Sequence, residues 1–303
     1  MAAAGRDDEI RQLLAAAPSQ SAYAKLARAL CAAVEKPAAG EIAPRVFAMP
    51  WIIVCGASAD ATIECVLRDA AALEHVLERE GVFGQSRNLG LSNALCAIET
   101  LEALPASRVW QWSQTPGQHD VPPAPIVLAR GEETVHVRFL LGAAIAPADA
   151  PDIVETGGNV GAWGTHALRA MAAQLVTPDV QILPLPRAPA GICSAAYAGR
   201  RAGMEAALNL FMSNSVRRFR MKLGDPSLTI SAHDDGEVRI TLWSAFDDAT
   251  TEGFRWPLHP QDDLDQIEQA ITTLAQECRL AEPLIRGSVL PARTTTGAVL
   301  FPR

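Results

Sequence analysis

Apolar residues recur at intervals of three and four along some stretches of the chain, and at intervals of two, or in short unbroken runs, along others. The first spacing builds the apolar stripe of a helix, and the second builds the buried face of a strand. The spacing of three and four predicts helices over 7–16, 20–34, 67–79, 91–104, 165–176, 200–213 and 261–278. The spacing of two and the short apolar runs predict strands over 46–55, 108–112, 126–129, 134–141, 179–185, 216–223, 227–233 and 237–244. We therefore expect an α+β fold with mainly antiparallel sheets.

Turn signals and a linker divide this pattern. The tetrapeptides GDPS (224–227) and DDGE (234–237) separate the last three predicted strands, and Asp-Gly is a strong hairpin signal. The sequence RGEE (130–133) predicts another hairpin. The segment APADAPD (146–152) is rich in proline and aspartate, which is typical of a boundary. We predict an N-terminal domain over 1–148 and a C-terminal domain over 149–303, with an extra helix over 261–279 and a tail.

The two halves of the chain resemble each other. Four segments match in the same order, namely 24–34 with 167–176, 46–51 with 180–185, 107–112 with 216–221, and 129–139 with 232–242. We interpret the matches as two degenerate helix–strand–helix–three-strand repeats, with helices on one face of each sheet, packed as a pseudo-twofold pair around a groove. The alternative is a chance similarity between two α+β halves.

A basic cluster stands out in an acidic chain whose net charge is −8. A strand over 216–223 would turn Phe219, Met221 and Leu223 to one face and the basic side chains to the other. Such a face could attract phosphate, RNA or an acidic partner. We favour a solvated strand face that discourages edge-to-edge pairing. The cluster consists of Arg200, Arg201, Arg217, Arg218, Arg220 and Lys222.

A glycine-rich segment before a predicted helix is the second candidate site. A loop of this kind can bind phosphate with helix N–H groups, and Arg187 could add charge. However, the entry segment 152–156 is short and polar, Trp163 would crowd a pyrophosphate, and no GxxxxGK[ST] motif occurs. We favour a linker between repeats in which Thr165 caps the helix. The segment contributes Gly157, Gly158, Gly161, Gly164 and Thr165.

The remaining reactive side chains form no recognisable motif. Six cysteines are scattered without CxxC or zinc spacing, so we expect buried, reduced thiols. His166 with Cys193 or Ser194 could be drawn into a triad, but no GxSxG motif supports one. The sequence predicts no catalytic residue, no metal ligand and no cofactor.

Acidic and aromatic clusters have structural explanations. Asp262, Asp263 and Asp265 are expected to begin a helix, and Asp247 with Asp248 to form a turn, rather than to bind a metal. The alternating pairs Trp110/Trp112 and Phe254/Trp256 are expected in the core, with anchoring of a partner as the alternative.

Composition limits the function classes. The chain has 303 residues, 49% of them hydrophobic, and a pI near 5.3, which disfavours nucleic-acid and membrane-surface binding. The longest apolar stretch, 46–57, is too short to span a bilayer, and the N-terminus lacks a signal-peptide pattern. We expect a cytoplasmic protein, and the preference for arginine over lysine, with abundant alanine, suggests a bacterial one.

These observations favour a non-catalytic binding, scaffold or regulatory protein that uses the inter-repeat groove, with a protein partner or as a homo-oligomer. One alternative is an enzyme or sensor that binds a phosphorylated or nucleotide ligand at 157–165. A second alternative is a nucleic-acid binder that uses the basic strand 217–222.

Overall fold

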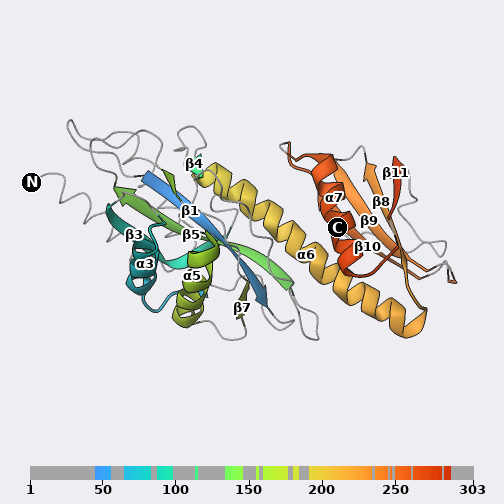
Figure 1. Ribbon diagram of the computed structural model, residues 1–303, viewed down its shortest axis with the longest axis horizontal. Coiled ribbons are helices and arrows are strands. Elements are labelled where there is room, and N and C mark those ends of the chain that lie inside the picture. Colours follow the sequence, from blue (N-terminus) through green and yellow to red (C-terminus); the bar gives the residue numbers. More distant parts are fainter. Residues whose placement is uncertain are drawn as a thin grey trace, which may run out of the picture. The chain divides into compact units, whose positions relative to one another are not determined.

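The computed structural model in Figure 1 divides the chain into two compact units, residues 1–203 and 204–303. The predicted domain boundary at 148/149 lies outside the described residues. So do the predicted elements over 7–16, 20–34, 108–112 and 126–129. The structure describes residues 45–55, 65–82, 87–97, 113–114, 134–145, 155–156, 160–176, 180–183, 191–233, 236–244, 246–247, 250–260, 262–281 and 283–287.

The N-terminal unit contains a five-stranded antiparallel sheet in the order β2-β3-β5-β1-β7. The long pair at its centre runs in register from Arg45↔Ala144 to Cys55↔Thr134. Two further short strands, β4 and β6, pair in parallel. The strands are β1 (Arg45–Cys55), β2 (Cys65–Val66), β3 (Arg87–Ala97), β4 (Ser113–Gln114), β5 (Thr134–Ile145), β6 (Glu155–Thr156) and β7 (Val180–Leu183).

Helices cover both faces of this sheet. Helix α3 (Ala70–Arg79) and helix α5 (Val160–Gln174) pack on the face that carries alternate β1 residues, including Phe47, Met49 and Trp51 (Figure 1). On the opposite face, Gly199 and Gly203 of helix α6 (Ile192–Lys222) lie against Phe139 and Val137 of β5. Because both faces are buried, β1 reads as one continuous apolar run, RVFAMPWIIVC.

The same double burial explains one wrong prediction. Residues 91–104 were expected to form a helix, but 91–97 belong to β3. Leu91 and Leu95 face the core with α3 and α5, while Ser92 and Cys96 are also buried. Apolar residues on both faces, together with register shifts along the strand, imitate the spacing of three and four that a helix shows.

The C-terminal unit contains a four-stranded sheet in the order β10-β9-β8-β11, in which only the β8/β11 pair is parallel. Its strands are β8 (Ser227–His233), β9 (Glu237–Trp243), β10 (Thr251–Pro257) and β11 (Leu284–Gly287). The predicted Asp-Gly hairpin is confirmed, since β8 and β9 pair in register around Gly236, whose φ of +78° favours glycine.

One face of this sheet is apolar and covered by helices. Side chains from α6 and from helix α7 (Leu264–Glu277) pack on alternate residues of β8, β9 and β10. The core includes Leu208, Met212, Ile240, Trp256 and Ile271, each at most 2% exposed. The opposite face, which carries Thr229, Ser231, Glu237 and Thr241, is polar and also buried.

The basic strand predicted over 216–223 is wrong, because residues 192–222 form the single helix α6. The sequence VRRFRMKL fits two periods. Its apolar positions alternate locally, but they also continue the spacing Leu208, Met212, Val216, Phe219 of a helix stripe. Burial of the longer stripe against β8 and β9 favours the helix over the strand.

The predicted repeats and their pseudo-twofold packing stay a prediction. Strand β7, which the match of 180–185 with 46–51 assigned to the second repeat, pairs with β1 in the N-terminal unit. Both misassigned stretches, 91–97 and 216–222, lie inside the proposed repeat units. Within the residues that the structure describes, no helix combines the length and the apolar character needed to cross a membrane.

Candidate functional site

The final turns of α6 carry the predicted basic cluster and sort it into separate faces. Leu208, Met212, Val216 and Phe219 recur at three and four and fill the core of the C-terminal unit. The basic side chains must therefore occupy the remaining circumference of the helix. They form two stripes, one over β10 and one beside the end of α7.

The stripe over β10 is used for internal ion pairing. Arg218 Nε donates to Glu252 Oε1 at 3.0 Å, and Arg218 also bonds Glu252 Oε2. The Ser215 hydroxyl donates to Glu252 Oε2 and accepts from Arg218 at 3.0 Å. Burial alone would raise the pKa of Glu252, but these hydrogen bonds and the charges of Arg218 and Lys222 outweigh it and lower the pKa.

The other stripe lines an open groove of about 380 Å³ in the C-terminal unit. Met221 is 69% exposed there, although a strand would have turned it inward. An exposed thioether beside a concave surface is a feature of surfaces that bind partners. The groove is lined by Ser213, Val216, Arg217, Arg220, Met221 and Cys278.

Arg220 builds one wall of this groove. Its Nε donates to Asp225 Oδ1 at 2.5 Å, and its Nη2 donates to the backbone oxygens of Cys278 at 2.9 Å and Arg279 at 3.3 Å. These oxygens lie at the C-terminal end of α7, where the helix dipole favours a cation. Arg220 is therefore a structural link between α6 and α7, and its charge is compensated in part.

Arg217 differs from its neighbours. It is exposed, it lines the groove, and no ion pair is present for it among the residues that the structure describes. A cation next to exposed apolar surface can bind an anionic group without first breaking an internal contact. Within the predicted cluster, Arg217 is thus available to a ligand, Arg220 has a structural role, and Arg218 belongs to the Glu252 network. Arg200 and Arg201 belong to the N-terminal unit.

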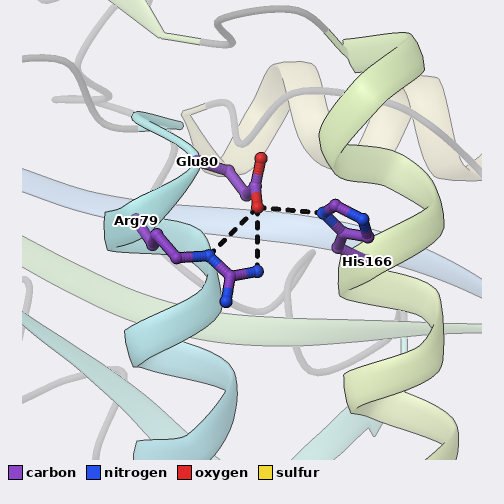
Figure 2. A network of polar contacts seen from close by, with 3 residues as sticks. All are labelled: Arg79, Glu80 and His166. Carbon is purple, nitrogen blue, oxygen red and sulfur yellow. Dashed lines mark hydrogen bonds and ion pairs between the residues drawn. The ribbon is translucent and has the colours of Figure 1, made fainter.

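The N-terminal unit contains a different charged network, shown in Figure 2. Glu80 Oε1, just after α3, accepts hydrogen bonds from Arg79 Nη2 at 2.9 Å and Nε at 3.2 Å. His166 Nδ1, on α5, lies 2.9 Å from the same oxygen. The hydrogen bonds from His166 and Arg79 lower the pKa of Glu80. His166 therefore links α5 to the end of α3, a structural role rather than the catalytic role of a triad.

The predicted burial is confirmed for three of the described cysteines. Cys55, Cys65 and Cys96 are buried, Cys278 is half-buried, and none of the four forms a disulfide. Burial raises the pKa of Cys65 to about 11 and that of Cys96 to about 12. Thiols with such pKa values stay protonated at neutral pH, and a protonated thiol is a poor nucleophile.

The glycine-rich segment lies partly outside the described residues, as do Gly157, Gly158 and Arg187. Gly161, Gly164 and Thr165 lie inside α5, which begins at Val160. The predicted cap at Thr165 is therefore wrong, because a residue inside a helix has no exposed first-turn N–H to satisfy. The loop that would cradle a phosphate is absent from 160–165.

The predicted positions of Asp263 at a helix start, Asp247 in a turn and Trp256 in the core are confirmed. Asp263 caps α7 by accepting from Asp265 N at 3.0 Å, and Asp247 closes a turn with Thr250. Trp256 is 1% exposed in the core, with Phe254 packed against it. No cluster of three or more metal-ligating side chains occurs among the described residues.

The sequence reading missed the partners of the basic residues. Glu252 lies 34 positions from Arg218, and Cys278 lies 58 positions from Arg220. A continuous helical register through 208–223 would have revealed the two stripes, but not these partners. In comparisons with known proteins, no family model, no curated protein and no solved structure gives a significant match.

Proposed function

We propose that this chain is a non-catalytic binding protein that holds an acidic segment of a protein partner in the groove at the end of α6. The observation that carries the proposal is one concave surface that combines Met221, 69% exposed, with Arg217, which forms no ion pair among the described residues. The apolar surface would supply affinity by burial, and Arg217 would select partners of opposite charge.

The dimensions of the groove suit one or two anchoring side chains. Its volume of about 380 Å³ is at the lower end of the range of pockets that enclose small ligands, and its open form suits a segment lying along the surface. Two basic residues of the same helix, Arg218 and Arg220, are already paired internally, which weakens the positive surface that nucleic acid would need. This supports an acidic peptide over a polyanion.

A photo-crosslinking amino acid at position 221 tests the proposal in extracts of cells that make this protein. Position 269, exposed on α7, is the matched control. We expect an adduct at 221 that is absent at 269, maps to an acidic segment of one protein, and falls at least tenfold with Arg217→Glu. Circular dichroism confirms that the variants remain folded.

Three results would contradict the proposal. The first is an equal adduct at both positions, and the second is an adduct at 221 that is insensitive to Arg217→Glu. The third is crosslinking to nucleic acid, which would favour the nucleic-acid alternative. The alternative of a phosphorylated or nucleotide ligand at 157–165 stays a prediction that no described contact favours.

A further inference from the structure

The final turns of α6 present a regular face to the groove. Ser213, Arg217 and Met221 line it at intervals of four residues, so they follow one another along one side of the helix. The Ser213 hydroxyl donates to Asn209 Oδ1 at 3.3 Å, and Arg220 is bonded to the end of α7. A segment that enters the groove therefore meets one cation and one exposed thioether, with Cβ atoms about 6 Å apart.

One stretch of this chain has the complementary spacing. Residues 7–9, with the sequence DDE, are the only three consecutive acidic residues in the chain. The apolar residues that follow recur at three and four, which is the pattern that predicts a helix over 7–16. In such a helix Glu9 and Leu13 lie one turn apart, which is the separation of the cation and the thioether in the groove.

We propose that segment 7–16, which lies outside the described residues, occupies the groove when no partner is bound and so competes with the partner. The inference rests on the proposed function, because it takes the groove to be a binding site for acidic segments. Glu9 faces Arg217, and Leu13 covers Met221. An amphipathic helix in a groove uses apolar anchors of this spacing, and the charge pair fixes its register.

The chain that joins the segment to β1 is long. It consists of residues 17–44, of which 20–34 are predicted to be helical. The helical part advances about 22 Å, and the remaining residues, when extended, advance about 43 Å. The connection can therefore span about 65 Å.

This span exceeds the path to the groove. Seven residues of β1, about 23 Å, separate Arg45 from Ile52, which pairs with Val137. Val137 lies against Gly203 of α6, and fourteen helical residues, about 21 Å, separate Gly203 from Arg217. The two parts amount to about 44 Å, and the difference of about 20 Å is enough for the step from sheet to helix. The segment thus reaches the groove whatever the arrangement of the two units.

A contact within one chain needs little affinity to compete. Tethering gives the two surfaces an effective concentration on the order of 1 mM, so a contact with a Kd of about 1 mM is half formed. At that occupancy the binding of a partner is weakened about twofold, and a tighter contact weakens it further.

Photo-crosslinking of the purified full chain tests the contact in the absence of any partner. With the photo-crosslinking amino acid at position 221, we expect an adduct to 7–16 whose yield is independent of protein concentration. Position 269, exposed on α7, should give no such adduct. Arg217→Glu should reduce the yield at least tenfold, and adding Glu9→Arg to the same chain should restore most of it, because the pair of charges is then reversed. Restoration also shows that the loss in Arg217→Glu is not a loss of folding.

The crosslinking experiment in extracts then separates this contact from the proposed function. Neutralising the acidic run should release the groove and increase the adduct to the partner at least twofold. Glu41→Gln, at an acidic residue outside the segment, is the matched control and should leave the adduct unchanged. The neutralised chain carries Asp7→Asn, Asp8→Asn and Glu9→Gln.

The inference is overturned if the purified chain gives no adduct to 7–16, or if that adduct is insensitive to Arg217→Glu. It is also overturned if a mixture of isotopically light and heavy chains gives mainly adducts between the two, because the occupant is then a second copy. An adduct to a partner in extracts, without an adduct to 7–16 in the purified chain, overturns this inference and leaves the proposed function standing. The absence of both adducts overturns both.

Discussion

Replacing Gly142 by alanine should destabilise the N-terminal unit through one identifiable contact. Gly142 of β5 lies directly opposite Phe47 of β1, and a methyl group at Gly142 would lie 2.2 Å from Phe47 Cζ. Phe47 is fully buried in the core against α3 and α5, so its ring has nowhere to move. Overpacking of this kind costs about 1–3 kcal/mol.

The same substitution also has a stabilising effect, which is smaller than the cost of overpacking. Alanine restricts the unfolded chain more than glycine does, which favours the variant by about 0.5–1 kcal/mol. The expected net loss for Gly142→Ala is therefore about 1–2 kcal/mol. In a Phe47→Leu background the ring is gone, so only the opposing term remains, and the same alanine should be neutral or stabilising by about 0.5 kcal/mol. The two backgrounds should differ by about 2 kcal/mol, a normal coupling for residues in contact.

Hydrogen exchange followed by mass spectrometry measures this cycle, because peptides from β1 and β5 report on the N-terminal unit separately from β8 to β10. The free energies of exchange for the slowest amides give the stability of that unit. The reasoning is refuted if Gly142→Ala changes stability by less than about 0.5 kcal/mol in the parent, or if the loss is the same in both backgrounds.

Three further changes have defined outcomes. Gly203→Ala would place a methyl group 2.3 Å from Val137 Cγ2, so it should cost about 1–3 kcal/mol in the same exchange assay, unless Val137→Ala is added. Arg279→Gly should stabilise the C-terminal unit by about 1 kcal/mol in urea unfolding, because Arg279 ends α7 with a φ of +55°; a loss would contradict this. Glu237, whose side chain is 8% exposed and is held by Arg239 and Arg255, has a pKa below its ordinary value of 4.5. The contribution of the Glu237 carboxylate to the free energy of unfolding is therefore present above about pH 4.5 and lost as the pH falls further. Glu237→Gln should cost about 3 kcal/mol of stability at neutral pH and should abolish this part of the acid sensitivity.

The pKa of Glu237 reflects a competition that the structure resolves. Burial alone would raise it, whereas hydrogen bonds from Arg255 and Arg239 and their positive charges lower it, and the latter prevail. If unfolding curves of the parent and of Glu237→Gln stay parallel between pH 7 and pH 3, the carboxylate is not the source of the acid sensitivity.

Local patterns predicted those elements whose burial matches their own period. Strands β8 and β9 and the Asp-Gly turn between them agree with the sequence because one face is apolar and the other polar. Helix α7 agrees because Asp263 and Asp265 mark its first turn. The pattern failed at β3 and at the end of α6, where burial on both faces or a short alternating run fitted two periods equally well.

The candidate sites were less accessible to sequence reasoning, for a different reason. The basic cluster was visible, but its division depends on Glu252 and Asp225, and only tertiary contact shows which arginine each acid neutralises.

Helix α6 shows why a cluster of like charges is a poor guide to function until its partners are known. One turn of this helix holds Arg217, Arg218 and Arg220, yet Arg218 stabilises β10 through Glu252, and Arg220 ties the end of α7 through two backbone oxygens. Removing either would disturb the fold, and a loss of binding would then carry no information about the ligand. Substitution of Arg217 changes the surface without breaking an ion pair among the described residues, so it alone separates recognition from stability. A binding defect in Arg217→Glu that is matched by unchanged unfolding is therefore the decisive pair of measurements for this surface.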